Sequence, residues 1–272
     1  MVLLHQLHQQ AQHELIVAHF DHGIREDSAA DARFVAAAAR GYGLPFVSER
    51  VELGPGASED AARRARYDFL QRVAAEYAAV IVTAHHADDV IETIALNILR
   101  GTGWRGLAVM ERTGVMRPLL RTTKQQLRDY ALAHRLEWVE DSTNADDTYT
   151  RNRLRRQLGR HVQFEQRQAL LMMWSRQREL RRAIDRELER FLSPHHDYDR
   201  YLMTMVDDVA AHELLRAMVM HAGGPSPLRP QAERALIAIK VARPGSIHDV
   251  GDGTRLRFTR QTFVVEHSST VL

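Results

Sequence analysis

Short apolar segments alternate with helical ones over the first part of the chain. Strands are predicted at residues 15–20, 45–53 and 79–83. Helices are predicted between and after them, at 31–40, 58–75 and 87–99. Nearly continuous apolar strands that alternate with helices are typical of a parallel sheet with helices on both faces. The pattern therefore predicts an α/β fold with a Rossmann-like parallel sheet.

The second part of the chain is mainly helical before it ends in a hairpin. Helices are predicted at 124–135, 163–191, 209–221 and 230–241. Strands at 246–250 and 255–259 flank Gly251, Asp252 and Gly253, a sequence typical of a tight turn. We expect a catalytic domain at 1–160, a basic helical linker at 161–194 and a small α+β domain at 195–272.

The composition narrows the class of protein. Cysteine is absent, which excludes disulfides, thiolate-bound zinc, cysteine-ligated iron–sulfur clusters and cysteine nucleophiles. No apolar run approaches the roughly 20 residues that cross a bilayer, and residues 1–17 lack the features of a signal peptide. We therefore expect a cytoplasmic protein with no membrane partner.

Positive charge is unevenly distributed along the chain. Lysine occurs only at Lys124 and Lys240, and twelve arginines against five acidic residues lie in 151–190, although the whole chain carries only +2. Arginine forks fit phosphate oxygens, so this region is a candidate nucleic-acid surface. The alternative is a solvated helix with Glu–Arg pairs, to which Asp185 and Glu187 would contribute.

The segment 83–93 has the sharpest chemical signal. It follows an apolar strand and begins a helix, and His85, Asp89 and Glu92 share one face if the helix includes His85. An imidazole with two carboxylates could hold a divalent metal or an ammonium group. Alternatively, Asp88 or Asp89 caps the helix and its neighbours face solvent. The helix is too apolar for a surface helix, which favours a functional role.

Two further groups of residues are candidates for substrate or phosphate binding. Arg63 and Arg66 lie three apart on a predicted helix and are therefore side by side, although a basic surface turn explains the spacing equally simply. Asp21, His22 and Gly23 follow the first predicted strand, where α/β proteins bind ligands. Gly23 would allow a ligand to approach the backbone closely.

Residues 141–155 combine a polar turn with closely spaced arginines. The turn sequence is Asp-Ser-Thr-Asn, and it is followed by Arg151, Asn152, Arg153 and Arg155. Such a loop suits contact with the backbone of a tRNA. An Asx turn ahead of an exposed helix is the alternative.

Six motifs, taken together and in this order, resemble those of the tRNA(Ile)-lysidine synthetases. They are His-Phe-Asp-His-Gly-Ile-Arg at 19–25, Ala-Arg-Arg-Ala-Arg-Tyr at 62–67, His-His-x-x-Asp-x-x-Glu-Thr at 85–93, Arg-Gly-Thr-Gly at 100–103, Arg-Pro-Leu-Leu at 117–120 and the segment 141–155. The resemblance covers about residues 1–156, and the remainder is similar to the family's C-terminal domain only loosely.

The resemblance implies a PP-loop fold of the adenine nucleotide α-hydrolase type and a reaction that consumes lysine and ATP, with Mg²⁺ expected. ATP adenylates the C2 oxygen of the wobble cytidine in tRNA(Ile) with a CAU anticodon, releasing pyrophosphate, and lysine then displaces AMP. It implies that His85, Asp89 and Glu92 form the reaction centre, that Arg63 or Arg66 faces phosphate, and that the arginines at 151–155 face tRNA. A homodimer is compatible with it.

One motif of the family has no counterpart in this chain. Lysidine synthetases begin with a Ser-Gly-Gly-x-Asp-Ser loop that holds pyrophosphate, whereas the first glycine here is Gly23. Residues 1–7 resemble the helix that follows that loop. We therefore expect an upstream segment with the loop and the first strand, no catalysis by residues 1–272 alone, and partial disorder at residues 1–12.

Three alternatives to an active lysidine synthetase remain at this point. A tRNA-binding protein without catalytic activity would bind RNA but release no pyrophosphate. A metal-dependent hydrolase would use His85, Asp89 and Glu92 as ligands, although we predict no metal site. Relatives that thiolate tRNA share the nucleotide domain but generally need cysteine, which is absent here.

Overall fold

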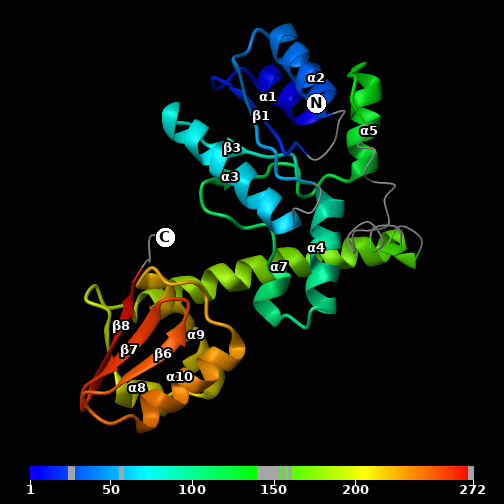
Figure 1. The fold of residues 1–272 in the computed structure, drawn as a ribbon. Helices are drawn as coiled ribbons and strands as arrows, with labels where there is room; N and C mark the ends of the chain where they lie inside the picture. Colours follow the sequence, from blue (N-terminus) through cyan, green and yellow to red (C-terminus); the bar gives the residue numbers. More distant parts are fainter. Residues whose placement is uncertain (24–27, 55–57, 140–153, 155–156, 159–160, 269–272) are drawn as a thin grey trace. The chain divides into compact units, whose positions relative to one another are not determined.

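The computed structural model of the chain describes residues 1–23, 28–54, 58–139, 154, 157–158 and 161–268 (Figure 1). The chain divides into two compact units, Met1–Gln177 and Arg178–Leu272. The boundary lies inside the long helix α7 (Phe164–Glu189). None of the helices in the described part of the chain is both long and apolar enough to span a bilayer.

The first unit contains two pairs of parallel strands. β1 (Val17–Asp21) pairs with β2 (Phe46–Arg50), and β3 (Ile81–Val82) pairs with β4 (Val115–Met116). This confirms the predicted parallel α/β arrangement. Within the described residues, however, the two pairs are separate two-stranded sheets, and the third predicted strand at 79–83 is shorter than expected.

Helices flank these strands in the order that the sequence predicts. They are α1 (Val2–Gln10), α2 (Ser28–Gly41), α3 (Glu59–Glu76), α4 (Ala87–Leu99), the 3-10 helix η1 (Trp104–Leu107) and α5 (Lys124–Ala133). Ser58 caps the amino end of α3, because its hydroxyl accepts a hydrogen bond from the Ala61 amide at 3.1 Å. The range predicted for α4 agrees with the structure.

The expected disorder at the N-terminus is wrong for residues 2–10, which form α1. Aromatic contacts account for this. The His5 ring hydrogen-bonds the Tyr42 hydroxyl at 3.0 Å and lies 5.9 Å from the Tyr130 ring, measured between centroids. The helix ends at Ala11, which has a left-handed φ of 48°.

Two apolar clusters hold the first unit together. One joins α4 to the first half of α7 and consists of Val90, Ile94, Val109, Leu120 and Trp174. The other joins β1 to α3 and consists of Phe20, Phe69 and Val73. Trp174 is 1% exposed, and its indole N–H donates to the Val109 carbonyl at 3.0 Å, so its one polar atom is satisfied.

The second unit is the predicted small α+β structure. Its antiparallel sheet has the order β5 (Asp197–Asp199), β8 (Thr262–His267), β7 (Thr254–Phe258) and β6 (Ile247–Gly251). Its helices are the end of α7, α8 (Arg200–Met205), α9 (Asp208–His221) and α10 (Arg229–Val241). The predicted hairpin joins β6 to β7, and Asp252 and Gly253 take the positive φ values, 51° and 76°, that such a turn requires.

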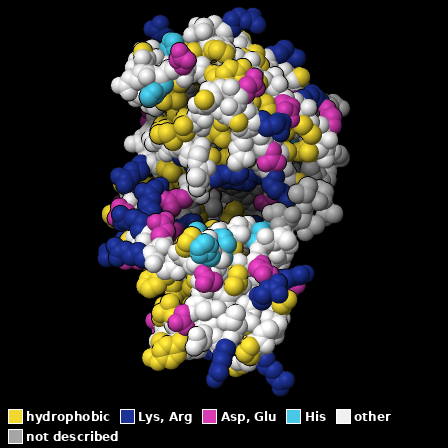
Figure 2. Space-filling model, turned by 90° about the vertical axis from the view of Figure 1, so that its left-hand side faces the viewer, with side chains coloured by type: hydrophobic (Ala, Val, Ile, Leu, Met, Phe, Trp, Pro, Cys, Tyr) yellow, Lys and Arg dark blue, Asp and Glu magenta, His cyan; other side chains and the backbone are white. Residues whose placement is uncertain are grey.

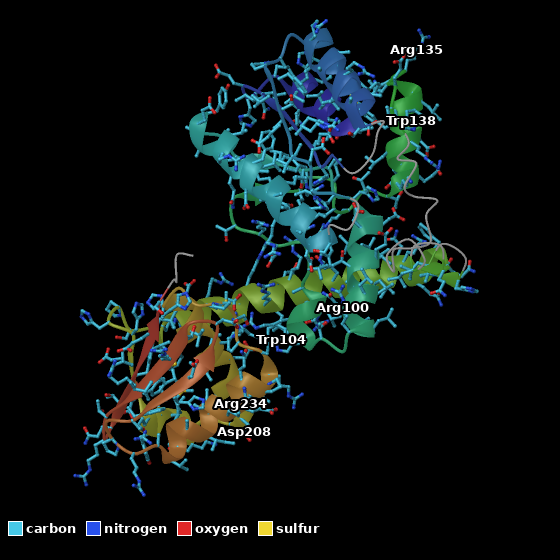
Figure 3. The ribbon with its side chains drawn as sticks, in the orientation of Figure 1. Arg100, Trp104, Arg135, Trp138, Asp208 and Arg234 are labelled. Carbon is cyan, nitrogen blue, oxygen red and sulfur yellow. The ribbon has the colours of Figure 1, made fainter. Side chains whose placement is uncertain are left out.

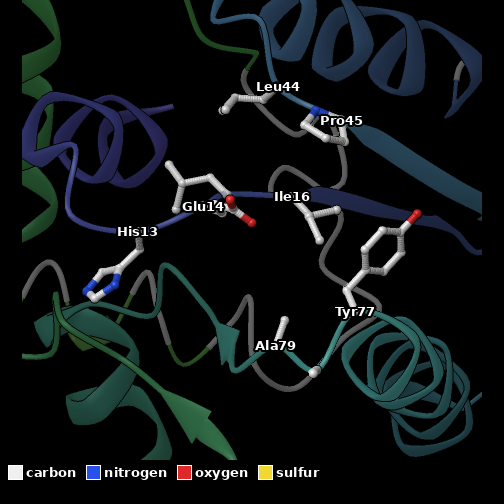
Figure 4. A pocket seen from close by; sticks show the side chains of 9 residues that line it. His13, Glu14, Ile16, Leu44, Pro45, Tyr77 and Ala79 are labelled. Atoms are coloured by element: carbon white, nitrogen blue, oxygen red, sulfur yellow. The ribbon is translucent and has the colours of Figure 1, made fainter.

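A cavity of about 620 Å³ lies in the first unit (Figure 4). It is lined by His13, Glu14, Leu15, Ile16, Leu44, Pro45, Tyr77, Ala78 and Ala79. These residues precede β1, β2 and β3, so the cavity is at the amino ends of the strands. Ligands of parallel α/β sheets bind at the carboxyl ends, where the predicted site residues lie.

Candidate functional site

The end of β1 forms a tight polar turn. The carboxylate of Asp21 is 6% exposed, accepts the Gly23 amide at 2.9 Å and lies 3.4 Å from the Arg50 guanidinium. Burial alone would raise the pKa of Asp21, but the Gly23 amide, the Ser28 side chain and Arg50 together lower it. Gly23 has a φ of 62°, which glycine adopts at little cost. Asp21 therefore holds this turn as a fixed carboxylate.

The turn between β3 and α4 carries the predicted reaction centre. The condition for a shared helical face is not met, because α4 begins two residues after His85, and the His85 ring instead hydrogen-bonds the Thr83 hydroxyl at 2.9 Å. One oxygen of Asp89 accepts the His86 amide at 2.9 Å, so Asp89 caps its own helix. Glu92 is only 4% exposed. The turn nevertheless brings His85 close to Asp89.

Charges of both signs surround His85. Burial lowers the pKa of this imidazole to about 4, the nearby Asp89 carboxylate opposes that shift, and Arg117, Arg63 and Arg66 add to it. The ring is therefore neutral at pH 7. Because the His85 ring is neutral, the Asp89 carboxylate near it favours binding of a cation. The arginines near the same ring favour binding of an anion.

A buried tyrosine gathers the arginines. Tyr67 is 1% exposed, and the guanidinium carbons of Arg112, Arg63 and Arg66 lie 4.0, 5.2 and 5.7 Å from the centre of its ring. The charge of Arg66 also acts on His22 at the end of β1. Burial is the main cause that lowers the pKa of His22, and the Arg66 charge lowers it further. The structure thus brings Arg63 and Arg66 together, as the sequence predicts, and connects them to both strand ends.

Two arginines of this cluster were not predicted as site residues. Arg112 was not singled out, and Arg117 appeared only within a family motif. Arg117 donates to the Tyr67 hydroxyl at 3.0 Å and to the Met110 carbonyl at 2.5 Å. Apart from that motif, no local pattern identifies either residue, because their contacts with Tyr67 join distant parts of the sequence.

The predicted tRNA-binding residues Arg151, Asn152, Arg153 and Arg155 lie outside the described residues. The preceding helix, α5, is followed by Arg135 and by Trp138, which is 41% exposed (Figure 3). Farther along the basic region, some arginines do pair with acids, as Arg190 does with Glu187 at 2.7 Å. Such pairs match the alternative of a solvated helix for that part.

On the face that Figure 2 shows, arginine and lysine side chains are interspersed with acidic ones. Among the described residues, no group of three or more His, Asp or Glu side chains is arranged to hold a metal ion.

The sequence of this chain is similar to those of known proteins. A family model described as a PP-loop domain matches residues 1–162. The tRNA(Ile)-lysidine synthase of Thermus thermophilus is 45% identical over 162 residues, which cover 57% of this chain and 32% of that protein. The one of Pseudomonas aeruginosa is 41% identical over 168 residues, covering 58% and 38%. The chain thus spans less than half the length of these relatives.

A solved structure shares the fold. It is the U34-tRNA thiolase NcsA from Methanococcus maripaludis with its 4Fe–4S cluster, and it superimposes with a TM-score of 0.53 at 16% identity over 65% of this chain and 68% of its own. At this identity the likeness concerns the fold alone. The match of the PP-loop model to residues 1–162, more than half of the chain, shows that the protein belongs to the PP-loop family.

Proposed function

We propose that this chain attaches lysine to C2 of the wobble cytidine of tRNA(Ile) with a CAU anticodon, forming lysidine and releasing AMP and pyrophosphate from ATP. The observation that carries the proposal is the presence of opposite charges around the neutral His85. The reaction needs side chains of both charges, because ATP is a polyanion and lysine carries an ammonium group. The identity with lysidine synthases supports this choice among PP-loop reactions.

Each group of the site has a part in the proposed reaction. Arg63 and Arg66 hold the phosphates of ATP, next to the strand end with Asp21, His22 and Gly23. Asp89 and Glu92 attract the ammonium of lysine, and a neutral His85 avoids repelling it and can accept a proton from the attacking amine. Mg²⁺ enters with the ATP phosphates, which suits the preference of this ion for phosphate and carboxylate oxygens.

The proposal includes the arrangement of the whole chain. Residues 1–160 form the catalytic part, 161–194 a basic helical link and 195–272 a C-terminal part for tRNA contact. Arg151, Asn152, Arg153 and Arg155 bind the tRNA backbone. A cytoplasmic location and a homodimer belong to the proposal as well.

A second possibility is that the 272 residues bind tRNA without catalysing. The observation that favours it is the lack of a Ser-Gly-Gly-x-Asp-Ser sequence in the chain, whose first glycine is Gly23. Such a loop supplies the backbone amides that stabilise pyrophosphate. This possibility predicts that residues 1–272 bind tRNA but do not release pyrophosphate.

The test is tRNA-dependent release of pyrophosphate from ATP in the presence of lysine. It compares the chain of 272 residues with the same chain preceded by a loop-bearing segment, and tRNA(Ile) with a transcript whose wobble base is uridine. The proposal predicts release only with cytidine at the wobble position. Release from the longer protein but not from the chain of 272 residues would favour the second possibility. Release that ignores the wobble base would contradict the proposed substrate.

A further inference from the structure

The loop 110–114, between η1 and β4, has a defined backbone shape. Its first residue, Met110, has a left-handed φ of 69°, which is unfavourable for a residue that carries a Cβ. At its other end the Val115 amide donates to the Arg112 carbonyl at 3.2 Å and closes a turn, in which Gly114 has a φ of 74°. The loop is therefore fixed at both of its ends.

Arg117 joins this loop to α3. One terminal nitrogen of its guanidinium donates to the Met110 carbonyl at 2.5 Å, and the other donates to the Tyr67 hydroxyl at 3.0 Å. The same guanidinium thus holds the left-handed residue of the loop and the buried ring of α3. Because a guanidinium is planar, these two bonds fix the loop and the ring relative to each other.

The loop places Arg112 on the face of the Tyr67 ring. At 4.0 Å its guanidinium is closer to the ring centre than that of Arg63, at 5.2 Å, or that of Arg66, at 5.7 Å. Arg63 and Arg66 belong to the same helix as Tyr67, so their approach follows from their spacing in the sequence. Arg112 reaches the ring only because the loop carries it there.

The loop also lies next to the candidate reaction centre. Met116, in β4, accepts the Thr83 amide on its carbonyl at 3.0 Å, and the Thr83 hydroxyl hydrogen-bonds the His85 ring at 2.9 Å. Arg117 directly follows Met116 in the sequence. Two hydrogen bonds thus connect the strand between the loop and Arg117 to the turn that carries His85.

We propose that the loop 110–114 is a phosphate-binding loop, in which Arg112 contacts the pyrophosphate part of ATP and Arg117 is the positioning residue that holds the loop in place. This inference rests on the proposed function, because it takes the anion from the proposed reaction. Arg63 and Arg66 then bind the anion from α3, and Arg112 binds it from the loop. Three guanidinium groups suit a polyanion better than a single phosphate group.

Two simpler roles of Arg117 make different predictions. If Arg117 only stabilised the fold, its replacement would lower the free energy of unfolding without changing the affinity of the folded protein for pyrophosphate. If it bound the anion through its own charge, its effect would add to that of Arg112, because independent contacts contribute additively. Positioning instead requires that Arg112 matter only while Arg117 holds the loop.

The experiment is isothermal titration calorimetry of the chain of 272 residues with inorganic pyrophosphate. The variants are Arg112→Gln, Arg117→Gln, the double variant and Arg117→Lys, which keeps the charge but cannot form both bonds in one plane. Arg121→Gln is the control, because Arg121 is an exposed arginine that donates to the Ser175 hydroxyl instead. We expect the dissociation constant to rise about tenfold in each of the four variants and less than about twofold in the control.

Tyr67→Phe tests the same contact with a smaller change. It removes the hydroxyl that accepts from Arg117 but keeps the ring, so the dissociation constant should rise about threefold. Urea unfolding shows which variants are folded. If Arg117→Gln does not fold, Tyr67→Phe takes its place, and an unchanged dissociation constant in Tyr67→Phe would then overturn the inference.

Each result bears on the inference separately from the proposed function. Equal losses of affinity in both single variants and the double variant support positioning. A roughly hundredfold loss in the double variant overturns it, as do unchanged affinity in Arg117→Gln, recovery of affinity in Arg117→Lys, and failure of the unsubstituted chain to bind pyrophosphate. Lysidine formation is measured separately. Equal losses without lysidine formation would support the inference and count against the proposed reaction, whereas additive losses with lysidine formation would do the reverse.

Discussion

The guanidinium of Arg112 lies 4.0 Å from the centre of the Tyr67 ring, which is itself 1% exposed. Within the described part of the chain, neither Arg112 nor Arg63 forms an ion pair with a carboxylate, although both approach this ring. Several cations around one ring repel one another, and a bound anion would relieve that repulsion. We therefore propose that Tyr67 is the platform of an anion site.

Replacing Arg112 by glutamine should weaken binding of inorganic pyrophosphate. Loss of one charged hydrogen-bond donor costs about 1–2 kcal/mol of binding free energy, which raises the dissociation constant about 5- to 30-fold. Isothermal titration calorimetry measures this dissociation constant. Arg64→Gln is the matched control, since Arg64 is an exposed arginine of α3. Equal affinity of Arg112→Gln and Arg64→Gln would show that Arg112 does not contact the anion.

Asp89 has two roles that substitution can separate. Asparagine keeps an oxygen for the His86 amide but loses the charge, so Asp89→Asn should preserve stability and weaken lysine binding by about 2 kcal/mol, or about thirtyfold. Alanine also removes the cap, so Asp89→Ala should lose about 1 kcal/mol of unfolding free energy in addition. Urea unfolding and lysine titration measure the two effects. Normal lysine affinity in Asp89→Asn would rule out Asp89 as the ammonium site.

Stability should depend on pH through His85. Its pKa is about 4 in the folded protein and about 6.5 when unfolded, so between these values the unfolded chain binds the extra proton. The stabilising effect of the neutral ring is complete above pH 6.5 and is lost as the pH falls toward 4. Between pH 7 and pH 5, the free energy of unfolding measured with urea should therefore decrease more for wild type than for His85→Gln. Equal decreases would mean that His85 titrates normally.

The arginines at 151–155 should act through phosphate groups. Replacing Arg151, Arg153 and Arg155 together with glutamine should weaken binding of tRNAs in general. The slope of log affinity against log salt should become shallower by about one unit for each phosphate group that the protein no longer neutralises. Filter binding at several salt concentrations gives the slope. An unchanged slope would indicate that these side chains point into solvent.

Local sequence signals predicted the elements whose determinants are local. The Ser58 cap of α3 and the Gly-Asp-Gly turn of the last hairpin each act within a few residues. The strand at 79–83 was overestimated because an apolar run specifies neither burial nor pairing: only Ile81 and Val82 pair, and Val80 is 59% exposed. Disorder at the N-terminus was wrongly expected because His5 gains its partners from distant helices.

The sequence indicated candidate site residues but not their geometry. The motifs identified His85, Asp89 and the arginines of α3, whereas the low pKa of His85 arises from burial and from charges on other elements. The same holds for Arg112 over Tyr67 and for the ion pair of Asp88 in α4 with Arg167 in α7, whose partners are far apart in the sequence. Contacts of this kind follow from the packing of α3, α4 and α7, which periodicity does not specify.

The most direct test of the central claim is mass spectrometry of the nucleosides from tRNA(Ile) after incubation with ATP and lysine. The enzyme is the chain preceded by a loop-bearing segment, with Asp89→Asn and Arg63→Gln in the same background. We predict lysidine in place of the wobble cytidine with the unsubstituted protein, and at least about tenfold less with either variant at limiting lysine or ATP. An unmodified cytidine with the unsubstituted protein, or full conversion by both variants, would contradict the assignment of anion and ammonium sites on either side of His85.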